Sequence, residues 1–307
     1  MTPDLSIIIS NYNTKDFLAV CLDSIASHLK NVSYEIIVVD DASGDGSSDI
    51  IEKNYPQIIL LRNKMNMGYS KSYNRGTKAA KGKYILHLNS DTTFSKPFDF
   101  SLLIKYLEIY PDIGILGVKI IKDNGKLDLP CKRSFPTLVN VFFQSTGLAF
   151  LFPQNKIFGN YYLSYLTENK IHEVDCLMGA FMLIKKEVID EIGYIDERFY
   201  MYGEDIDFCY RAKKRGWKIV YYPKVSITHH HGGTTRQKGI SSLWLFHYAM
   251  YQYYQKHFAS TSFLLINLIT YLAILLRFLL FVCLFTVISL IPKRISMRYH
   301  KIAAFQP

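Results

Sequence analysis

The sequence has 307 residues, of which 49% are hydrophobic, and it carries a formal net charge of +10. This length and apolar content favour one large catalytic domain with an appendage. The five cysteines contain no CxxC pair, which excludes a disulfide framework or a zinc site of that spacing and favours a reducing compartment. The positive charge favours an anionic partner: a nucleic acid, a phosphorylated substrate or a membrane surface.

The first elements in chain order alternate between strand and helix. The start of the chain lacks the basic region and long apolar run of a signal peptide, so we expect the main domain in the cytosol. The pattern predicts strands at 5–13, 34–40, 58–63 and 84–91, and helices at 16–29, 48–55 and 69–82. Such alternation predicts an α/β fold with a mostly parallel sheet flanked by helices, in which ligands bind at the carboxyl ends of the strands.

The second half of the chain is less regular. Residues 123–172 are rich in aromatic residues and have no firm period, so we interpret them as a variable insertion on the acceptor side of the site. Around this insertion the pattern predicts a helix at 98–110, a strand at 113–121, a strand and helix within 174–193, a helix from Glu204 to a stop at Gly216, and a strand at 218–222.

The apolar stretch 263–291 predicts attachment to a membrane. Its length could span a bilayer, but Arg277 lies near its middle, where a cation facing lipid costs about 3 kcal/mol. Basic residues on both sides favour cytosolic ends. We therefore expect two short helices in the interface with Arg277 at the bend; a buried oligomerisation helix is the alternative. The predicted domains are 1–240 and a helical, membrane-associated segment 241–307.

Asn89 and Asp91 follow the strand at 84–91. A cation that holds a diphosphate needs hard oxygen ligands, and these two side chains offer one charged and one neutral oxygen. The alternative is an Asx turn that closes the strand.

Asp40 ends the second predicted strand, level with Ser10 and Asn11 of the first. A carboxylate there could accept the imide N–H of uracil or thymine, and the following Gly/Ser turn would admit the ring. Alternatively, Asp40 caps the next helix.

Three acids, Glu204, Asp205 and Asp207, begin a predicted helix. The helix dipole tolerates acids at this end, so their charge alone has a structural explanation. A carboxylate held there could also deprotonate an acceptor hydroxyl as it attacks a sugar carbon.

The stretch "THHHGGTTR" at 228–236 follows the last predicted strand. At most two of three consecutive histidines can face one ion, and imidazole is an acceptable ligand for manganese. A surface histidine run is the alternative. The glycines would let the backbone and Arg236 approach a phosphate.

Taken together, these motifs resemble the inverting glycosyltransferases of family 2, which have the GT-A nucleotide-sugar fold, and most closely the rhamnosyltransferase-like branch. The matching stretches, in the family's order over about residues 5–236, are "SIIISNYN", "VVDDASGDGS", "NMGYSKSYNRG", "LNSDTTF", "GAFMLIKKEV", "YGEDIDFCYRAKKRGW" and "ITHHHGGTT".

The resemblance implies roles for individual residues. Asp40 matches the base-binding aspartate, Asp91 the metal-binding aspartate, and Asp205 the general base. Asn89 stands where many members carry an acid. The other residues matched are His229 as a metal ligand, Asn66, Gly68 and Asn74 beside the nucleotide, and Gly179 and Ala180, with Glu204, beside the donor sugar and acceptor.

The resemblance further implies a single displacement with inversion, assisted by a divalent cation, Mn²⁺ or Mg²⁺. The expected partners are a dTDP-, UDP- or GDP-linked sugar such as rhamnose, a lipid-linked glycan acceptor of bacterial surface polysaccharide synthesis, and the cytoplasmic face of the membrane. A homo-oligomer also fits this chain.

Two other classes fit less well. A sugar nucleotidyltransferase would show a Gly-rich loop after the first strand, whereas "SNYNTKDF" has no glycine. A nucleic-acid-binding module would interleave basic and aromatic residues on one surface, whereas the basic residues here are dispersed. We therefore expect no nucleic-acid partner.

Overall fold

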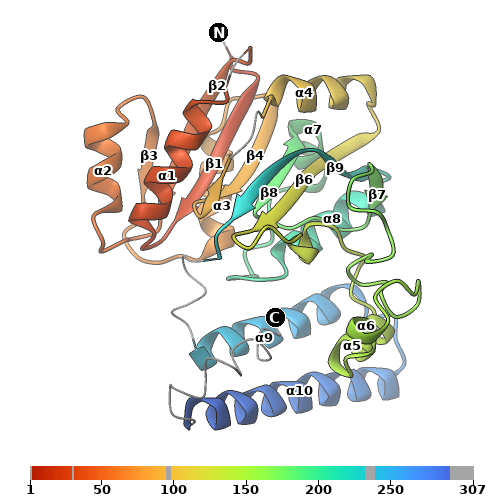
Figure 1. Cartoon of the computed structure of the whole chain (residues 1–307). Helices are drawn as coiled ribbons and strands as arrows, with labels where there is room; N and C mark the ends of the chain where they lie inside the picture. Colours follow the sequence, from red (N-terminus) through yellow and green to blue (C-terminus); the bar gives the residue numbers. More distant parts are fainter. Residues whose placement is uncertain (1, 30, 95–97, 232–238, 291–307) are drawn as a thin grey trace. The chain divides into compact units, whose positions relative to one another are not determined.

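The structure is a computed structural model that describes residues 2–29, 31–94, 98–231 and 239–290, with side chains as far as residue 287 in the last segment (Figure 1). The chain divides into two compact units. The first comprises Met1–Tyr200 and Glu204–Arg236, and the second Met201–Gly203 and Gln237–Pro307. The predicted boundary between residues 240 and 241 stays a prediction.

The amino-terminal half of the first unit follows the predicted alternation. Its strands lie parallel in the order β3-β2-β1-β4. The elements are β1 (Leu5–Asn11), α1 (Lys15–Ala26), β2 (Tyr34–Asp40), α2 (Ser47–Asn54), β3 (Ile59–Arg62), α3 (Tyr69–Ala79) and β4 (Tyr84–Asn89). Residues 5–9 are all buried, so both faces of the sheet are covered. Helix α3 packs closely because a Cβ at Gly76 would lie 2.4 Å from Ile8 Cγ2.

The other half of the sheet runs in mixed directions (Figure 1). Its strands are β5 (Thr92–Thr93), β6 (Ile113–Lys122), β7 (His172–Val174), β8 (Phe181–Lys185) and β9 (Lys218–His229). Strand β8 lies between β4 and β6 and is antiparallel to both. It begins at the edge where β4 ends, since Asn89 N donates to Ala180 O at 3.1 Å. The predicted α/β fold is confirmed, and the antiparallel β8 brings residues 179–180 to the carboxyl end of β4.

Strand β9 is longer than the predicted 218–222. Proline cannot donate to a strand ladder, which is why the sequence predicts a stop before Pro223. The pairing with β6 instead shifts register: Val118 pairs with Tyr222, and the next residue, Lys119, pairs with Ser226. This bulge accommodates the proline and carries the strand on to His229.

The remaining helices of the first unit are α4 (Phe100–Ile109), α7 (Lys186–Ile192) and α8 (Glu204–Lys214), close to their predicted ranges. The aromatic insertion contains a 3-10 turn, η1 (Leu129–Cys131), and two short helices, α5 (Leu138–Ser145) and α6 (Leu148–Leu151). In α8 the buried Asp207 pairs with Arg211 Nε at 2.9 Å, one helical turn away, so this third acid has a structural role.

The second unit contains two antiparallel helices, α9 (Gly239–His257) and α10 (Leu264–Leu290). Their ends are joined where Tyr254 Oη donates to Asn267 Oδ1 at 2.8 Å. Toward the other end, the rings of Trp244 and Phe278 lie 5.7 Å apart. Residues 264–287 of α10 are long and apolar enough to cross a membrane, with a mean hydropathy of 2.6, and 6% of the most apolar window is buried.

The expectation of two short helices with a bend at Arg277 is wrong. Helix α10 continues through this residue, whose side chain contacts His247 and Phe246 of α9 and Phe281 of α10 itself. Arg277 Nη1 lies 3.1 Å from His247 Nε2, and its guanidinium carbon lies 5.3 Å and 4.9 Å from the ring centres of Phe246 and Phe281. The cation is held by a neighbouring helix, so it needs no break in α10.

Candidate active site

Polar strand ends of the sheet meet at one edge of the first unit. Asn11 at the end of β1 lies opposite Asp40 at the end of β2. Ser10 lies opposite Asn89 at the end of β4. Thr14 Oγ1 donates to Asn11 Oδ1 at 2.5 Å and so fixes that amide beside Asp40. The strand pattern therefore predicted this meeting of side chains correctly.

Asp40 is buried and already hydrogen-bonded within its own loop. Its Oδ1 accepts from Asn11 Nδ2 at 3.0 Å, and its Oδ2 accepts from Ser48 Oγ at 2.9 Å and Ser43 N at 3.2 Å. A carboxylate offers about four acceptor positions, so these three bonds leave about one for a ligand. The three bonds fix the direction of that remaining position.

Asp41 organises the loop before α3, a role that the sequence pattern does not predict. Its carboxylate accepts from the backbone N–H groups of Met67 at 2.8 Å and Gly68 at 2.9 Å. Gly68 has φ +87°, and a Cβ there would lie 2.5 Å from the Tyr200 ring. Any larger residue at 68 would therefore displace Tyr200 and open the loop.

Asn66 and Asn74 fasten this loop and α3 to the segment before α8. Tyr200 Oη donates to Asn66 Oδ1 at 2.5 Å. The buried Asn74 makes a two-way contact: its Nδ2 donates to Ile195 O at 2.8 Å, and Ile195 N donates to its Oδ1 at 3.1 Å. The nucleotide-binding roles of Asn66, Gly68 and Asn74 remain predictions.

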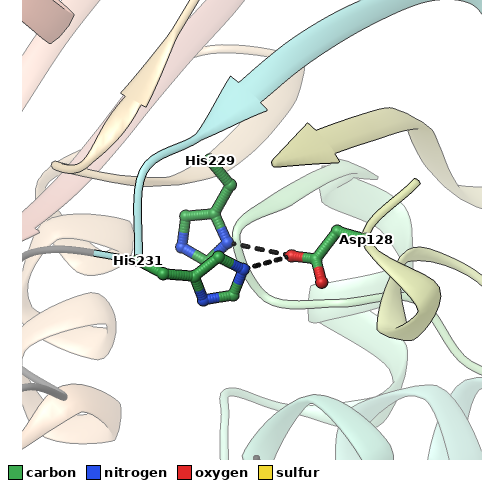
Figure 2. A group of neighbouring side chains, drawn as sticks. All are labelled: Asp128, His229 and His231. Carbon is green, nitrogen blue, oxygen red and sulfur yellow. Dashed lines mark hydrogen bonds and ion pairs between the residues drawn. The ribbon is translucent and has the colours of Figure 1, made fainter. Parts of the chain in front are cut away.

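Four carboxylate and imidazole side chains gather beyond the end of β4. Asp128 Oδ2 lies 3.2 Å from His229 Nδ1 and 2.7 Å from His231 Nε2, and Figure 2 shows both rings beside this carboxylate. His229 Nε2 lies 3.2 Å from Asp91 Oδ1. Because side chains alternate at a strand end, the middle histidine is separate: His230 Nδ1 contacts Asp123 Oδ1 at 2.5 Å.

The donor set of this cluster fits a divalent cation. Ligand atoms of Asp128, His229 and His231 lie within 4.8 Å of one another. Asp128 Oδ1 is buried without a hydrogen bond among the described residues, although Lys122 Nζ lies 3.5 Å away. Carboxylate oxygens and imidazole nitrogens suit manganese and similar ions.

The carboxylates and imidazoles of this cluster shift each other's pKa values. Burial alone would raise the pKa of Asp128, but the hydrogen bonds from His229 and His231 lower it. Burial alone would lower the pKa of His229, but the contacts with Asp128 and Asp91 raise it to about 9. Two buried carboxylates thus favour a positive charge at His229, and a bound cation would supply that charge in place of the proton.

Asn89 faces two neighbours in this region. Its Oδ1 accepts from Tyr69 Oη at 3.0 Å, and its Nδ2 lies 3.5 Å from His229 Nε2. A ligand role for Asn89 would require its amide to turn over, and it remains a prediction. Arg236, predicted to approach a phosphate, lies outside the described residues.

Asp205, in the first turn of α8, is held by three donors. Arg133 Nη2 donates to Asp205 Oδ2 at 2.5 Å, and Gly179 N donates to the same oxygen at 3.2 Å. Ile206 N donates to Oδ1 at 2.8 Å. The side chains of Arg133 and Asp205 are 9% and 12% exposed, so this ion pair is shielded from solvent and fixes the carboxylate firmly.

Glu204, next to Asp205, is kept in its neutral form. Burial, and then the charge of Asp205, raise the pKa of Glu204 from 4.5 to about 8. The folded chain therefore keeps a proton at neutral pH that the unfolded chain releases. The resulting cost to stability grows as the pH rises from about 4.5 to about 8.

A short chain of contacts links the two groups of acids. Tyr69 Oη contacts Gly179 O at 3.0 Å as well as Asn89, and Gly179 N donates to Asp205. Tyr69, Gly179, Glu204 and Asp205 line one small pocket. Ala180 follows at the start of β8, with its carbonyl on Asn89 N. The residues predicted to act on the donor sugar and the acceptor therefore lie together at the same edge as Asp91.

Four residues that line this region are not predicted by the sequence pattern: Tyr69, Asp128, Arg133 and His231. Asp128 and Arg133 lie in the aromatic insertion, which has no readable period, and they reach the site through contacts far along the chain. The spacing of charged residues within the insertion does not indicate that Asp128 or Arg133 belongs to a site. The run of three histidines did limit which of them could be metal ligands, because only alternate residues of the run can face the same ion.

Comparison with known proteins agrees with this geometry. The family model "Glycosyl transferase family 2" matches residues 6–193. An N-acetylglucosaminyl-diphospho-decaprenol L-rhamnosyltransferase of Mycobacterium tuberculosis is 26% identical over 82% of this chain and 84% of its own length. A low-salt glycan biosynthesis hexosyltransferase of Haloferax volcanii is 29% identical over 75% of this chain and 68% of its own length.

Solved structures show the same fold. A mannosyltransferase from Pyrobaculum calidifontis, in complex with GDP-Man and Mn²⁺, aligns with a TM-score of 0.56 and 15% identity over 83% of this chain and 65% of its own length. Staphylococcus aureus TarS aligns with a TM-score of 0.53 and 16% identity over 82% of this chain and 40% of its own length. The match of the family model over more than half of the sequence establishes that this chain belongs to glycosyl transferase family 2.

Proposed function

We propose that this glycosyltransferase moves a sugar, such as rhamnose, from a nucleoside diphosphate to a hydroxyl of a lipid-linked or polysaccharide acceptor in bacterial surface polysaccharide synthesis. The observation that carries the proposal is the position of Asp205, fixed by Arg133 beside a pocket that adjoins the acidic and histidine cluster. The printed activity of the mycobacterial relative supports rhamnose and a diphospho-lipid acceptor.

In this proposal Asp91, Asp128, His229 and His231 hold a divalent cation, Mn²⁺ or Mg²⁺. When bound, the cation neutralises the charge that develops on the leaving nucleoside diphosphate. The donor set of one carboxylate and two imidazoles, from Asp128, His229 and His231, supports manganese, and Asp91 faces the other ring nitrogen of His229. The mannosyltransferase of the same fold was solved with Mn²⁺.

Asp205 acts as the general base. Its carboxylate accepts the proton of the acceptor hydroxyl as that oxygen forms a bond to the anomeric carbon. The bond to the diphosphate breaks on the opposite face, so the configuration inverts, as is typical of family 2. Arg133, Gly179 N and Ile206 N keep the carboxylate oriented, which raises the share of productive encounters.

The nucleotide lies at the ends of β1 and β2 in this proposal. Asp40 accepts from the imide N–H of the base, with Ser10 and Asn11 beside it, and the loop at Asn66–Gly68 and α3 border the nucleoside. The remaining acceptor position on Asp40 can take an imide N–H, which uracil and thymine rings present. Gly179, Ala180 and Glu204 face the sugar, and Arg236 is proposed to meet a phosphate.

A screen of donors tests this function. The chain is mixed with manganese and with dTDP-, UDP- or GDP-linked sugars, and its thermal unfolding temperature is measured. We expect one nucleotide to raise this temperature only when manganese is present, and we expect the chain to transfer the sugar of that nucleotide once a lipid-linked acceptor is added. An unfolding temperature that is the same with every nucleotide as with buffer alone would contradict the proposal.

We also propose that the second unit attaches the enzyme to the cytoplasmic face of the membrane. Helix α10 exposes most of its apolar side chains, and such a surface is stable only against lipid or another protein. Removal of residues 261–307 is expected to release the enzyme into the supernatant when membranes are sedimented. Sedimentation of the truncated chain with the membranes to the same extent as the full chain would contradict this attachment.

A further inference from the structure

The aromatic insertion exposes a cluster of large apolar side chains. Across the described residues of the first unit, exposed apolar side chains are mostly scattered, but six fall within 19 consecutive positions of the insertion. Their exposed fractions lie between 52% and 82%. We name as the α5–α6 patch the residues Val139, Phe142, Phe150, Leu151, Phe152 and Ile157.

The exposure of this patch is built into the local structure. The rings of Phe143 and Phe158 pack 4.8 Å apart, and the ring of Phe152 lies 5.6 Å from that of Phe158. Thr137 caps α5 by accepting from Asn140 N at 3.1 Å. Inner rings and a cap therefore fix two short helices whose outer faces remain apolar.

The same segment is tied firmly to the catalytic unit. The buried Asn140 donates to Ser134 Oγ and to Phe135 O, each at 3.0 Å. Lys132, also buried, donates to Leu163 O at 2.7 Å. Arg133 lies between these anchors and holds Asp205. A displacement of the α5–α6 patch would therefore also displace the segment that positions the proposed base.

The charge of the insertion indicates what covers the patch. Residues 129–167 contain no aspartate or glutamate, and of their three cations Lys132 and Arg133 are buried, which leaves Lys156 at the surface. Lys156 is exposed and precedes Ile157 of the patch. An apolar surface with a nearby cation and without acids is complementary to an anionic lipid surface, which attracts the cation and accepts the aromatic side chains. A typical protein partner would be expected to meet a mixed polar rim instead.

We propose that the α5–α6 patch is a membrane-docking surface of the catalytic unit, separate from α10, which inserts into an anionic phospholipid bilayer. Docking through the segment that carries Arg133 would hold Asp205 near the bilayer surface. A lipid-linked acceptor presents its hydroxyl at that surface. This last consequence rests on the proposed function, whereas the binding to lipid does not.

A tryptophan probe tests the docking. Full-length Phe150→Trp is mixed with vesicles of equal parts phosphatidylcholine and phosphatidylglycerol whose acyl chains carry bromine, which quenches tryptophan on contact. The signal of the unsubstituted protein, from Trp217 and Trp244, is subtracted. We expect strong quenching of the added tryptophan. The matched control is Ile109→Trp, on α4 and 60% exposed, which should not be quenched.

A second measurement uses loss of the apolar surface. The triple variant Phe142→Ser, Phe150→Ser, Leu151→Ser should lower the partition of the full chain onto these vesicles by about tenfold or more, because three side chains lose their apolar contact. Thermal protection by the donor nucleotide should persist, which would show that the variant is folded. The same three changes at Leu102, Ile109 and Tyr110 serve as the control.

Three outcomes would overturn the docking proposal. The first is an unquenched added tryptophan in Phe150→Trp chains that are bound to vesicles, since α10 would then bind alone. The second is a change from a dimer to a monomer in the triple variant without an effect on vesicle binding, since a second copy would then cover the patch. The third is equal partition of the triple variant and the native chain. None of these results bears on donor binding, so the proposed sugar transfer would be judged separately.

Discussion

Asp205→Asn is expected to lower the turnover of sugar transfer by about 10² to 10⁴-fold, because an amide cannot accept the proton of the acceptor hydroxyl. The amide oxygen can still accept from Arg133 and Gly179 N, but the amide nitrogen cannot accept from Ile206 N, so the unfolding temperature of the variant is measured beside its turnover. Donor binding should change little, since Asp205 lies on the acceptor side of the proposed site. The measurements are steady-state turnover and nucleotide affinity in the same preparation.

Glu204→Gln provides a matched control for this variant. Glutamine has the shape of the neutral glutamic acid that burial maintains at this position, where the pKa is about 8. We expect its turnover at pH 7 to fall far less than that of Asp205→Asn. Between about pH 4.5 and pH 8 the native chain should lose stability as the pH rises, because the unfolded chain releases the Glu204 proton while the folded chain keeps it, and the glutamine variant should not show this loss. Near-normal turnover of Asp205→Asn would contradict the assignment of the base.

Asp128→Asn is expected to weaken manganese binding by at least about tenfold, because it removes the charge that faces both imidazoles. Titration calorimetry with manganese and nucleotide would measure this directly. Asp91→Ala should weaken metal-dependent donor binding to a similar extent. Both effects should also appear as a smaller rise in unfolding temperature on addition of manganese, a readout that does not depend on turnover.

Asp123→Asn is the control for the metal site. Asp123 contacts His230, the histidine that faces away from the cluster, and its side chain is 60% exposed. Asp123→Asn removes the carboxylate beside His230, which lies between His229 and His231 in the sequence. It should leave manganese affinity within about twofold, as expected for a surface ion pair. Equal affinities in the native chain and in Asp128→Asn would show that the cluster is only an ion-pair network.

The sequence predicted those parts of the site that depend on local pattern. Asp40, Asn89 and Asp91 follow apolar strands, and parallel strands end at a common edge, so their proximity could be expected. Asp205 opens a helix whose amphipathic pattern is clear. Each of these positions can be read from a window of about ten to fifteen residues around it.

The parts that depend on distant contacts were not predictable. Arg133 reaches Asp205 across 72 positions, and Asp128 reaches His229 across 101. Nothing near Asp128 or Arg133 in sequence distinguishes them from other charged residues in a loop. Arg277 illustrates the same limit, because its cost in an apolar helix was removed by Phe246 and His247 of another helix.

The ion pair between Arg133 and Asp205 has a consequence for engineering this enzyme. A hybrid that takes residues 129–166 from a relative, in order to accept a different glycan, would also replace the cation that orients the proposed base, Asp205. Such hybrids should be inactive unless a guanidinium is restored at the position of Arg133. If the insertion contacts the acceptor as proposed, one segment would both contact the acceptor and orient the proposed base.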